Sequence, residues 1–271
     1  MKKVILIIFA VLLIICLVNI LVSTFALKTT SFTVKIKSLP ASFEGFRIAQ
    51  ISDLHNMSFG INNSKLVEMV KAENPDIIVL TGDMMDDKTR DYDKLEKLFD
   101  ALAAIAPCYY VTGNHEAEVY KEYFAFEKRI KGKVKTLHTT SSEIERNGES
   151  IYIQGIDDPN FTPVFYDDLI KLGKKEGVKI LLSHRPEKFE RYVDNGFDLV
   201  LSGHTHGGQI RLPFIGAFVA PSQGLFPEYS DGLYTEGNTT MVISRGLGSS
   251  VVPFRFSNRP EIVIVDLTGE R

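Results

Sequence analysis

Hydrophobic and polar residues follow two alternating patterns along most of this chain. Short apolar runs bounded by glycine or polar residues predict buried strands, and apolar residues three or four positions apart predict helices. Strands that alternate with helices favour an α/β fold with helices on the outer faces of its sheets. We expect strands at residues 31–37, 46–51, 76–81, 108–111, 150–155, 178–182, 197–201, 241–244 and 262–265, and helices at 63–71, 92–105, 117–130 and 166–174.

Two stretches fit neither pattern well. Residues 133–147 give only a weak signal. Residues 213–232 are rich in glycine, proline and aromatic residues, which predicts a long structured loop. The phenylalanine and leucine residues of 213–226 allow two interpretations, contact with lipid or a membrane surface and packing inside the loop.

The N-terminal segment has a different character. Residues 4–27 carry no charge and follow two lysines, which predicts a transmembrane helix with its N-terminus inside the cell. The alternative is a signal peptide, with Thr24 and Ala26 as the small residues before a cleavage site. Signal peptides usually have apolar regions of only about 7–15 residues, so a retained anchor is favoured. We therefore expect residues 1–30 to be an anchor or signal and 31–271 to be one domain outside the cytoplasm.

Charge and cysteine content narrow the class of protein. The net charge is −3, and no basic stripe of the kind found in nucleic-acid-binding proteins is present, so no nucleic-acid partner is expected. Cys16 lies in the apolar N-terminal segment and Cys108 at the start of a predicted strand. A single cysteine in the soluble part cannot form an intramolecular disulfide. The cysteine content therefore does not indicate whether the domain lies in an oxidising or a reducing compartment.

Side chains that can bind metal follow five of the predicted strands. His204 and His206 come directly after one of these strands, and residues two apart in an extended backbone point the same way. Ligand sites in α/β folds collect beyond the carboxyl ends of the strands. Of the six histidines only His138 stands apart from these strand ends. The candidate ligands are Asp53, His55, Asp83, Asn114, His184, His204 and His206.

The types of these side chains indicate the kind of metal. Carboxylate, amide and imidazole ligands together suit Mn, Fe, Zn or a similar divalent ion. Seven ligands exceed the needs of one tetrahedral ion. They fit two ions about 3.5–4 Å apart that share a carboxylate.

The spacing of the clusters resembles a known signature. Asp53-x-His55, Gly82-Asp83-x-x-Asp86, Gly113-Asn114-His115-Glu116, His184 and Gly203-His204-x-His206 are similar to the five blocks of the calcineurin-like metallophosphoesterase superfamily. Two extended blocks, residues 183–187 and 207–209, resemble its membrane-associated bacterial phosphodiesterase branch, which includes UDP-2,3-diacylglucosamine hydrolase-like members.

The resemblance implies a fold and a role for each residue. The fold is expected to be a four-layer α/β/β/α sandwich. One ion is expected on Asp53, His55, Asp83 and His206, with Asp83 bridging to a second ion on Asn114, His184 and His204. His115 is expected to protonate the leaving group, and Asp86 to orient it. The family's purple acid phosphatases have a tyrosine at the position of Asp86, so that branch is not expected.

The expected activity is hydrolysis of a phosphodiester or pyrophosphate by hydroxide formed between the two ions. An anchor favours envelope or lipid-linked substrates. A phosphomonoesterase and a nuclease remain alternatives on the same site, although the acidic balance disfavours a nuclease. An inactive metal-binding scaffold is disfavoured because Asp83 and His115 are both present. The expected location is the cell membrane as a single-pass protein, with secretion after signal cleavage as the alternative.

Overall fold

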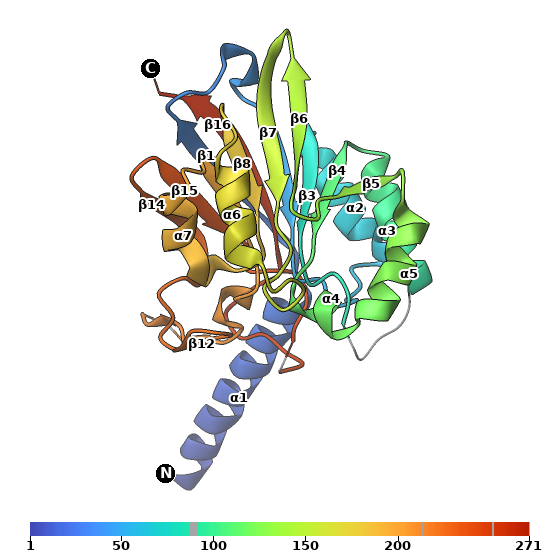
Figure 1. The fold of residues 1–271 in the computed structure, drawn as a ribbon. Helices are drawn as coiled ribbons and strands as arrows, with labels where there is room; N and C mark the ends of the chain where they lie inside the picture. The colour runs from blue at the N-terminus through green and yellow to red at the C-terminus, as the bar shows by residue number, and fades with distance from the viewer. Residues whose placement is uncertain (87–91, 213, 251, 271) are drawn as a thin grey trace.

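Two six-stranded mixed sheets form the centre of the molecule (Figure 1). The computed structural model describes residues 1–86, 92–212, 214–250 and 252–270. The first sheet has the order β1-β16-β2-β3-β4-β5, in which all pairs are parallel except β16 with β2. Its strands are β1 (Lys28–Ile36), β2 (Arg47–Ile51), β3 (Ile77–Thr81), β4 (Cys108–Val111), β5 (Val134–Thr136) and β16 (Glu261–Gly269).

The second sheet has the order β14-β15-β9-β8-β7-β6, with antiparallel pairs at both edges and parallel pairs between them. Parallel strands at the centre of a sheet are covered on both faces and are therefore apolar along their length. The strands are β6 (Thr140–Arg146), β7 (Glu149–Gly155), β8 (Lys179–Leu182), β9 (Leu199–Ser202), β14 (Gly232–Glu236) and β15 (Thr239–Ile243).

Three hydrophobic clusters separate four layers. The middle cluster joins the two sheets, with Ile48 and Val79 on one side and Ile153 and Leu201 on the other. The two outer clusters lie between each sheet and the helices on its outer face. This packing confirms the four-layer α/β/β/α arrangement. The helices are α2 (Ser64–Ala72), α3 (Tyr92–Ala103) and α5 (Tyr120–Ile130) beside the first sheet, and α6 (Phe165–Gly173) and α7 (Phe189–Asp194) beside the second.

Some elements differ from the sequence prediction. The helix expected from residue 117 is preceded by the short helix α4 (Asn114–Glu118). The weak stretch 133–147 contains β5 and β6, and the long loop 213–232 contains three two-residue strands and the first residue of β14. Pro213 lies outside the described residues. The short strands are β10 (Arg211–Leu212), β11 (Gly216–Ala217), β12 (Val219–Ala220) and β13 (Gly224–Leu225), and the 3-10 helices are η1 (Ala41–Phe43), η2 (Ile61–Asn63), η3 (Pro186–Lys188) and η4 (His206–Gly208).

The N-terminal helix α1 (Lys2–Phe25) projects from the end of the sandwich (Figure 1). It is long and apolar enough to cross a membrane, as an anchor or signal sequence would be. Its last turn joins the domain, because Ser23 and Thr24 are buried. The Oγ1 atom of Thr24 accepts the backbone N–H of Arg255 at 3.0 Å.

Candidate metal centre

Six of the seven predicted ligands, all except Asn114, lie together in two groups that share Asp83. Each follows the carboxyl end of a strand, and the ends of parallel strands meet at one edge of a sheet. The loop geometry is unusual, because Asp53, Asp83 and His204 have positive φ angles of 51°, 53° and 71°. Such angles are uncommon outside glycine, and strained backbone of this kind clusters at functional sites.

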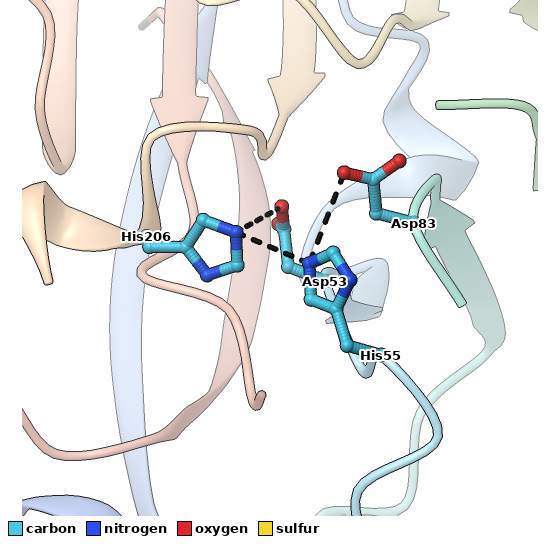
Figure 2. Close-up of side chains that lie close together, drawn as sticks. All are labelled: Asp53, His55, Asp83 and His206. Carbon is cyan, nitrogen blue, oxygen red and sulfur yellow. Dashed lines mark hydrogen bonds and ion pairs between the residues drawn. The ribbon is translucent and has the colours of Figure 1, made fainter. Parts of the chain in front are cut away.

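Four of the side chains form a first group around Asp53 (Figure 2). One ligand atom from each of Asp53, His55, Asp83 and His206 lies within 4.8 Å of the others. The Nε2 atoms of His55 and His206 are 3.1 Å apart. The Nε2 atom of His206 is 3.5 Å from Oδ1 of Asp53, and that of His55 is 3.8 Å from Oδ2 of Asp83.

Asp83 also belongs to a second group. Ligand atoms of Asp83, His184 and His204 lie within 4.8 Å of one another. Asn114 is the first residue of α4, and its Oδ1 atom is buried with no hydrogen-bond partner among the described residues. A buried acceptor without a partner is costly unless a cation or donor satisfies it.

The contacts of His184 show that its second nitrogen suits a metal ion. Its Nδ1–H donates to the backbone oxygen of Thr81 at 2.7 Å, so Nε2 of the neutral ring is an acceptor. This Nε2 faces Oδ2 of Asp83 at 3.1 Å. Burial lowers the pKa of His184, but the charge and hydrogen bond of Asp83 outweigh it and raise the pKa to about 10. Nε2 of His184 and Oδ2 of Asp83 are both acceptors, so they repel each other unless a proton or a cation lies between them. A divalent metal ion fits this position.

The other buried groups favour the form that binds metal. Burial lowers the pKa of His55 to about 3 and that of His206 well below its usual value, so both rings are neutral. Asp53 is the exception, because burial disfavours its charged form and raises its pKa to about 6. Burial also opposes the charge on Asp83, but the nearby His184 holds its pKa well below the usual value. Neutral imidazole and carboxylate ligands suit divalent Mn, Fe or Zn.

His115 lies beside the first group. Its ring makes an edge contact with His55, with centroids 4.7 Å apart, and its backbone N–H donates to Oδ1 of Asp83 at 2.9 Å. Its Nδ1 atom lies 3.1 Å from Oε2 of Glu118, without hydrogen-bond geometry. Asp86 is buried in the loop after β3 and interacts with other groups. A role for Asp86 in orienting His115 stays a prediction.

Glu116 is a site residue to which the sequence analysis gave no role beyond its place in the block of residues 113–116. Its side chain is fully buried in α4. Its Oε2 atom accepts the backbone N–H groups of Asp83 at 2.8 Å and Gly113 at 2.7 Å, and its Oε1 atom accepts that of Met85 at 3.0 Å. Glu116 therefore joins the loops after β3 and β4, and no sequence pattern indicates this pairing.

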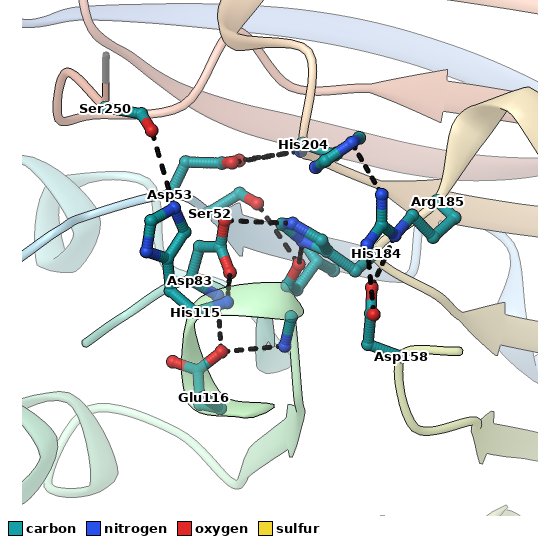
Figure 3. A network of polar contacts seen from close by, with 12 residues as sticks. Ser52, Asp53, Asp83, His115, Glu116, Asp158, His184, Arg185, His204 and Ser250 are labelled. Carbon is teal, nitrogen blue, oxygen red and sulfur yellow. Dashed lines mark hydrogen bonds and ion pairs between the residues drawn. The ribbon is translucent and has the colours of Figure 1, made fainter. Parts of the chain in front are cut away.

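Asp158 and Ser222 are further residues that the sequence analysis did not assign to the site (Figure 3 shows Asp158). Nε and Nη2 of Arg185 donate to Asp158 at 2.5 and 3.1 Å. Nη1 of Arg185 lies 2.8 Å from Nε2 of His204 and 2.9 Å from Oγ of Ser222. Arg185 is thus an ion-pair partner that also contacts a predicted ligand. Asp158 follows the end of β7, so the strand-end rule could have found it.

A family model for calcineurin-like phosphoesterases matches residues 46–208, which contain all seven predicted ligands. The chain belongs to this family. It is a metal-dependent phosphoesterase, and its buried aspartate and histidine cluster is consistent with the two-metal site typical of the family.

Curated relatives of this phosphoesterase match nearly its whole length. It is 32% identical to uncharacterized metallophosphoesterase YkuE of Bacillus subtilis, covering 89% of this chain and 85% of the relative. It is 31% identical to a Danio rerio transmembrane protein with metallophosphoesterase domain, covering 89% of this chain and 57% of the relative. It is 27% identical to phosphodiesterase YaeI of Escherichia coli, covering 82% of each. Among solved structures, TT1561 of Thermus thermophilus is similar over 74% of this chain and 89% of its own, at 15% identity and a TM-score of 0.48.

Proposed function

We propose that this phosphoesterase hydrolyses a phosphodiester or pyrophosphate bond with two divalent metal ions. The observation that carries the proposal is the pair of ligand groups that share Asp83, because two ions with a common carboxylate can act on one phosphate. The similarity to phosphodiesterase YaeI supports a diester over a monoester. Asp53, His55, Asp83 and His206 hold one ion, and Asp83, Asn114, His184 and His204 hold the other.

Residues beside the ligands provide the remaining chemistry. When bound, the two ions offset negative charge on the phosphate and lower the pKa of a water toward neutrality. His115 protonates the leaving oxygen from the side of His55, and Asp86 orients its ring. Glu116 keeps the loops of Asp83 and Asn114 in register through its three backbone hydrogen bonds. Arg185, paired with Asp158, holds His204 in place.

In this proposal α1 is a retained single-pass anchor, and residues 31–271 form the catalytic domain outside the cytoplasm. Signal cleavage after Ala26 would remove Ser23 and Thr24, which the domain buries and uses as hydrogen-bond acceptors for Asn258 and Arg255. The two N-terminal lysines favour the orientation with the N-terminus inside. The Danio rerio relative, a transmembrane protein, supports the anchor.

An anchored domain favours substrates in or near the envelope, such as lipid-linked or wall phosphodiesters. A sugar-nucleotide lipid like UDP-2,3-diacylglucosamine is one pyrophosphate of this class. The acidic net charge of −3 disfavours nucleic acids as substrates.

The test is turnover by the purified full chain in detergent after loading with Mn, Fe or Zn. A generic diester reporter, a monoester reporter and a lipid pyrophosphate are compared. We expect diester hydrolysis that a chelator abolishes and added metal restores. Asp83→Asn, which removes the shared carboxylate charge, is expected to lose activity and bound metal together. Metal-loaded protein that turns over none of the three substrates contradicts the proposal.

A further inference from the structure

The length of α1 limits how far the domain can lie from the membrane. Its 24 residues span about 36 Å at 1.5 Å per residue, and the hydrocarbon core is about 30 Å thick. The end of the helix already touches the domain, because Nδ2 of Asn19 donates to Oγ of Ser257 at 3.0 Å and Ser23 is buried. The domain surface around residues 255–258 therefore lies at the level of the lipid headgroups.

The same end of the domain carries an apolar surface. Figure 1 shows β12 on the side of the domain from which α1 projects. After residue 25, six of the twelve exposed large apolar side chains of the described residues lie between positions 214 and 226. This segment carries no charged residue. These side chains are Phe214, Ile215, Phe218, Val219, Leu225 and Phe226.

Charged residues close to α1 also suit a headgroup region. Arg259 is exposed at the end of α1 and donates to the backbone oxygens of Ala26 and Leu27 at 2.8 and 2.7 Å. Lys28 follows Leu27 in the sequence and forms an ion pair with Glu261. Basic residues at the end of a membrane helix commonly lie at the interface, with their charges at the headgroups.

The apolar segment also contacts the metal centre. The Oγ atom of Ser222, between β12 and β13, lies 3.1 Å from Nε2 of His204. A Cβ atom on Gly208, in the turn that follows His206, would lie 2.4 Å from the Cβ of Ala217. The segment therefore packs directly on the turn of two predicted ligands.

We propose that residues 214–226 form a second membrane contact, which inserts apolar side chains into the leaflet surface where α1 emerges. Large exposed apolar patches mark interaction sites, and the geometry of α1 brings this one to the bilayer. The contact fixes the orientation of the domain on α1 and holds the metal centre at the headgroup level. The inference rests on α1 as the retained anchor of the proposed function.

The chain contains no tryptophan, so a single introduced tryptophan reports on one position. Phe214→Trp tests the contact, and Phe226→Trp repeats it at a second position. Leu13→Trp in α1 is the embedded control, and Ile170→Trp on α6 is the exposed control, because Ile170 is 49% exposed. Each full-length variant is reconstituted in phosphatidylcholine and phosphatidylglycerol vesicles with or without brominated acyl chains. Its metal content confirms that it has folded.

Brominated lipid is expected to quench Leu13→Trp strongly. It is expected to reduce the emission of Phe214→Trp and Phe226→Trp to roughly half, because interfacial side chains lie at the boundary between headgroups and acyl chains. Ile170→Trp is expected to keep its emission. Emission of both loop variants that matches Ile170→Trp, with Leu13→Trp quenched, overturns the membrane contact alone. An unquenched Leu13→Trp overturns the anchor and the contact with it, but leaves hydrolysis in detergent unaffected.

Discussion

The ring of His115 lies beside the predicted ligands, with 15% of its side chain exposed, whereas the ring of His184 is fully buried. A histidine that touches the ligand group and still meets solvent suits proton transfer to a leaving group. We expect His115→Ala to keep both metals and to lower kcat by about 10²–10⁴-fold, the usual contribution of general acid catalysis. Elemental analysis and diester turnover check the two halves of this prediction.

Two carboxylates compete for the role of orienting His115. Asp86→Asn is expected to lower kcat less than His115→Ala does, and Glu118→Gln is the matched control, because Glu118 contacts the ring from an exposed position. The reverse order would assign the role to Glu118. A metal-free or fully active His115→Ala variant would show that His115 is a ligand or a bystander.

His138 predicts a pH dependence of stability away from the metal centre. Its Nδ1 atom lies 2.9 Å from Asp157 and its Nε2 atom 2.7 Å from Glu127. Burial lowers its pKa, but the two carboxylates outweigh burial and raise the pKa to about 9. The unfolded chain loses this proton near pH 6.5, so the stabilisation is complete below that pH and disappears as pH rises through 9.

We expect the free energy of unfolding to fall by about 1–2 kcal/mol between pH 6.5 and 9, after allowance for solvent screening. Urea unfolding at a series of pH values measures it, and an NMR titration of the ring gives the pKa directly. His138→Gln keeps a polar side chain without the titration, so its stability is expected to change less over this range. Equal pH profiles for both proteins would exclude His138 as the cause.

The ligands could be predicted from the sequence because apolar runs mark strands, and the carboxyl ends of parallel strands meet. This rule places Asp53 beside His204, which lies 151 positions later in the sequence. The carboxylate of Asp53 accepts the backbone N–H of His204. The contacts of Glu116, Arg185 and Ser222 could not be predicted, because they depend on how irregular loops fold. No periodic pattern records which backbone N–H a buried carboxylate accepts.

The same contrast holds for whole elements. The central strands were predicted because they are buried on both faces, as in β3, whose five residues are all buried. The edge strand β6 was missed because six of its seven residues are at least partly exposed, so its hydrophobic pattern is weak. The short helix α4 was missed except for its last two residues, which the predicted helix 117–130 includes because α5 begins only two residues after α4 ends.

The turn after β9 depends on a glycine at its start. A Cβ atom on Gly203 would lie 2.0 Å from Oγ of Ser52 and 2.4 Å from Oδ2 of Asp53. We expect Gly203→Ala to displace Asp53, to weaken metal binding, and to destabilise the fold by about 1–3 kcal/mol, as overpacking does. Metal affinity and thermal unfolding measure the two effects.

Gly269→Ala is the matched control, because its nearest neighbour, Oε2 of Glu44, would lie at an ordinary 3.6 Å. It is expected to bind metal like the parent chain. Unchanged metal affinity in Gly203→Ala would mean that the loops of β2 and β9 move apart freely, against the close packing described here.

At the scale of the whole molecule, residues 255–258 connect the anchor α1 to the metal centre. Thr24 at the end of α1 accepts the N–H of Arg255, and Nδ2 of Asn258 donates to the backbone oxygen of His206 at 2.6 Å. The apolar segment 214–226 contacts His204 through Ser222. Both proposed membrane contacts are therefore tied to the turn that carries two ligands.

This connection predicts that loss of the second membrane contact affects embedded substrates selectively. We expect Phe214→Ser combined with Phe226→Ser to lower turnover of a vesicle-embedded lipid diester by about tenfold, because each buried apolar side chain contributes roughly 1–3 kcal/mol to interfacial binding and part of this energy orients the site. Turnover of a water-soluble diester by the same vesicles is expected to remain within twofold of the parent, since neither side chain touches a ligand. Ile170→Ser, which removes an exposed apolar side chain from α6, controls for general surface effects. An equal loss on both substrates would show that the segment supports the metal centre itself, because a membrane contact alone leaves the soluble reaction intact.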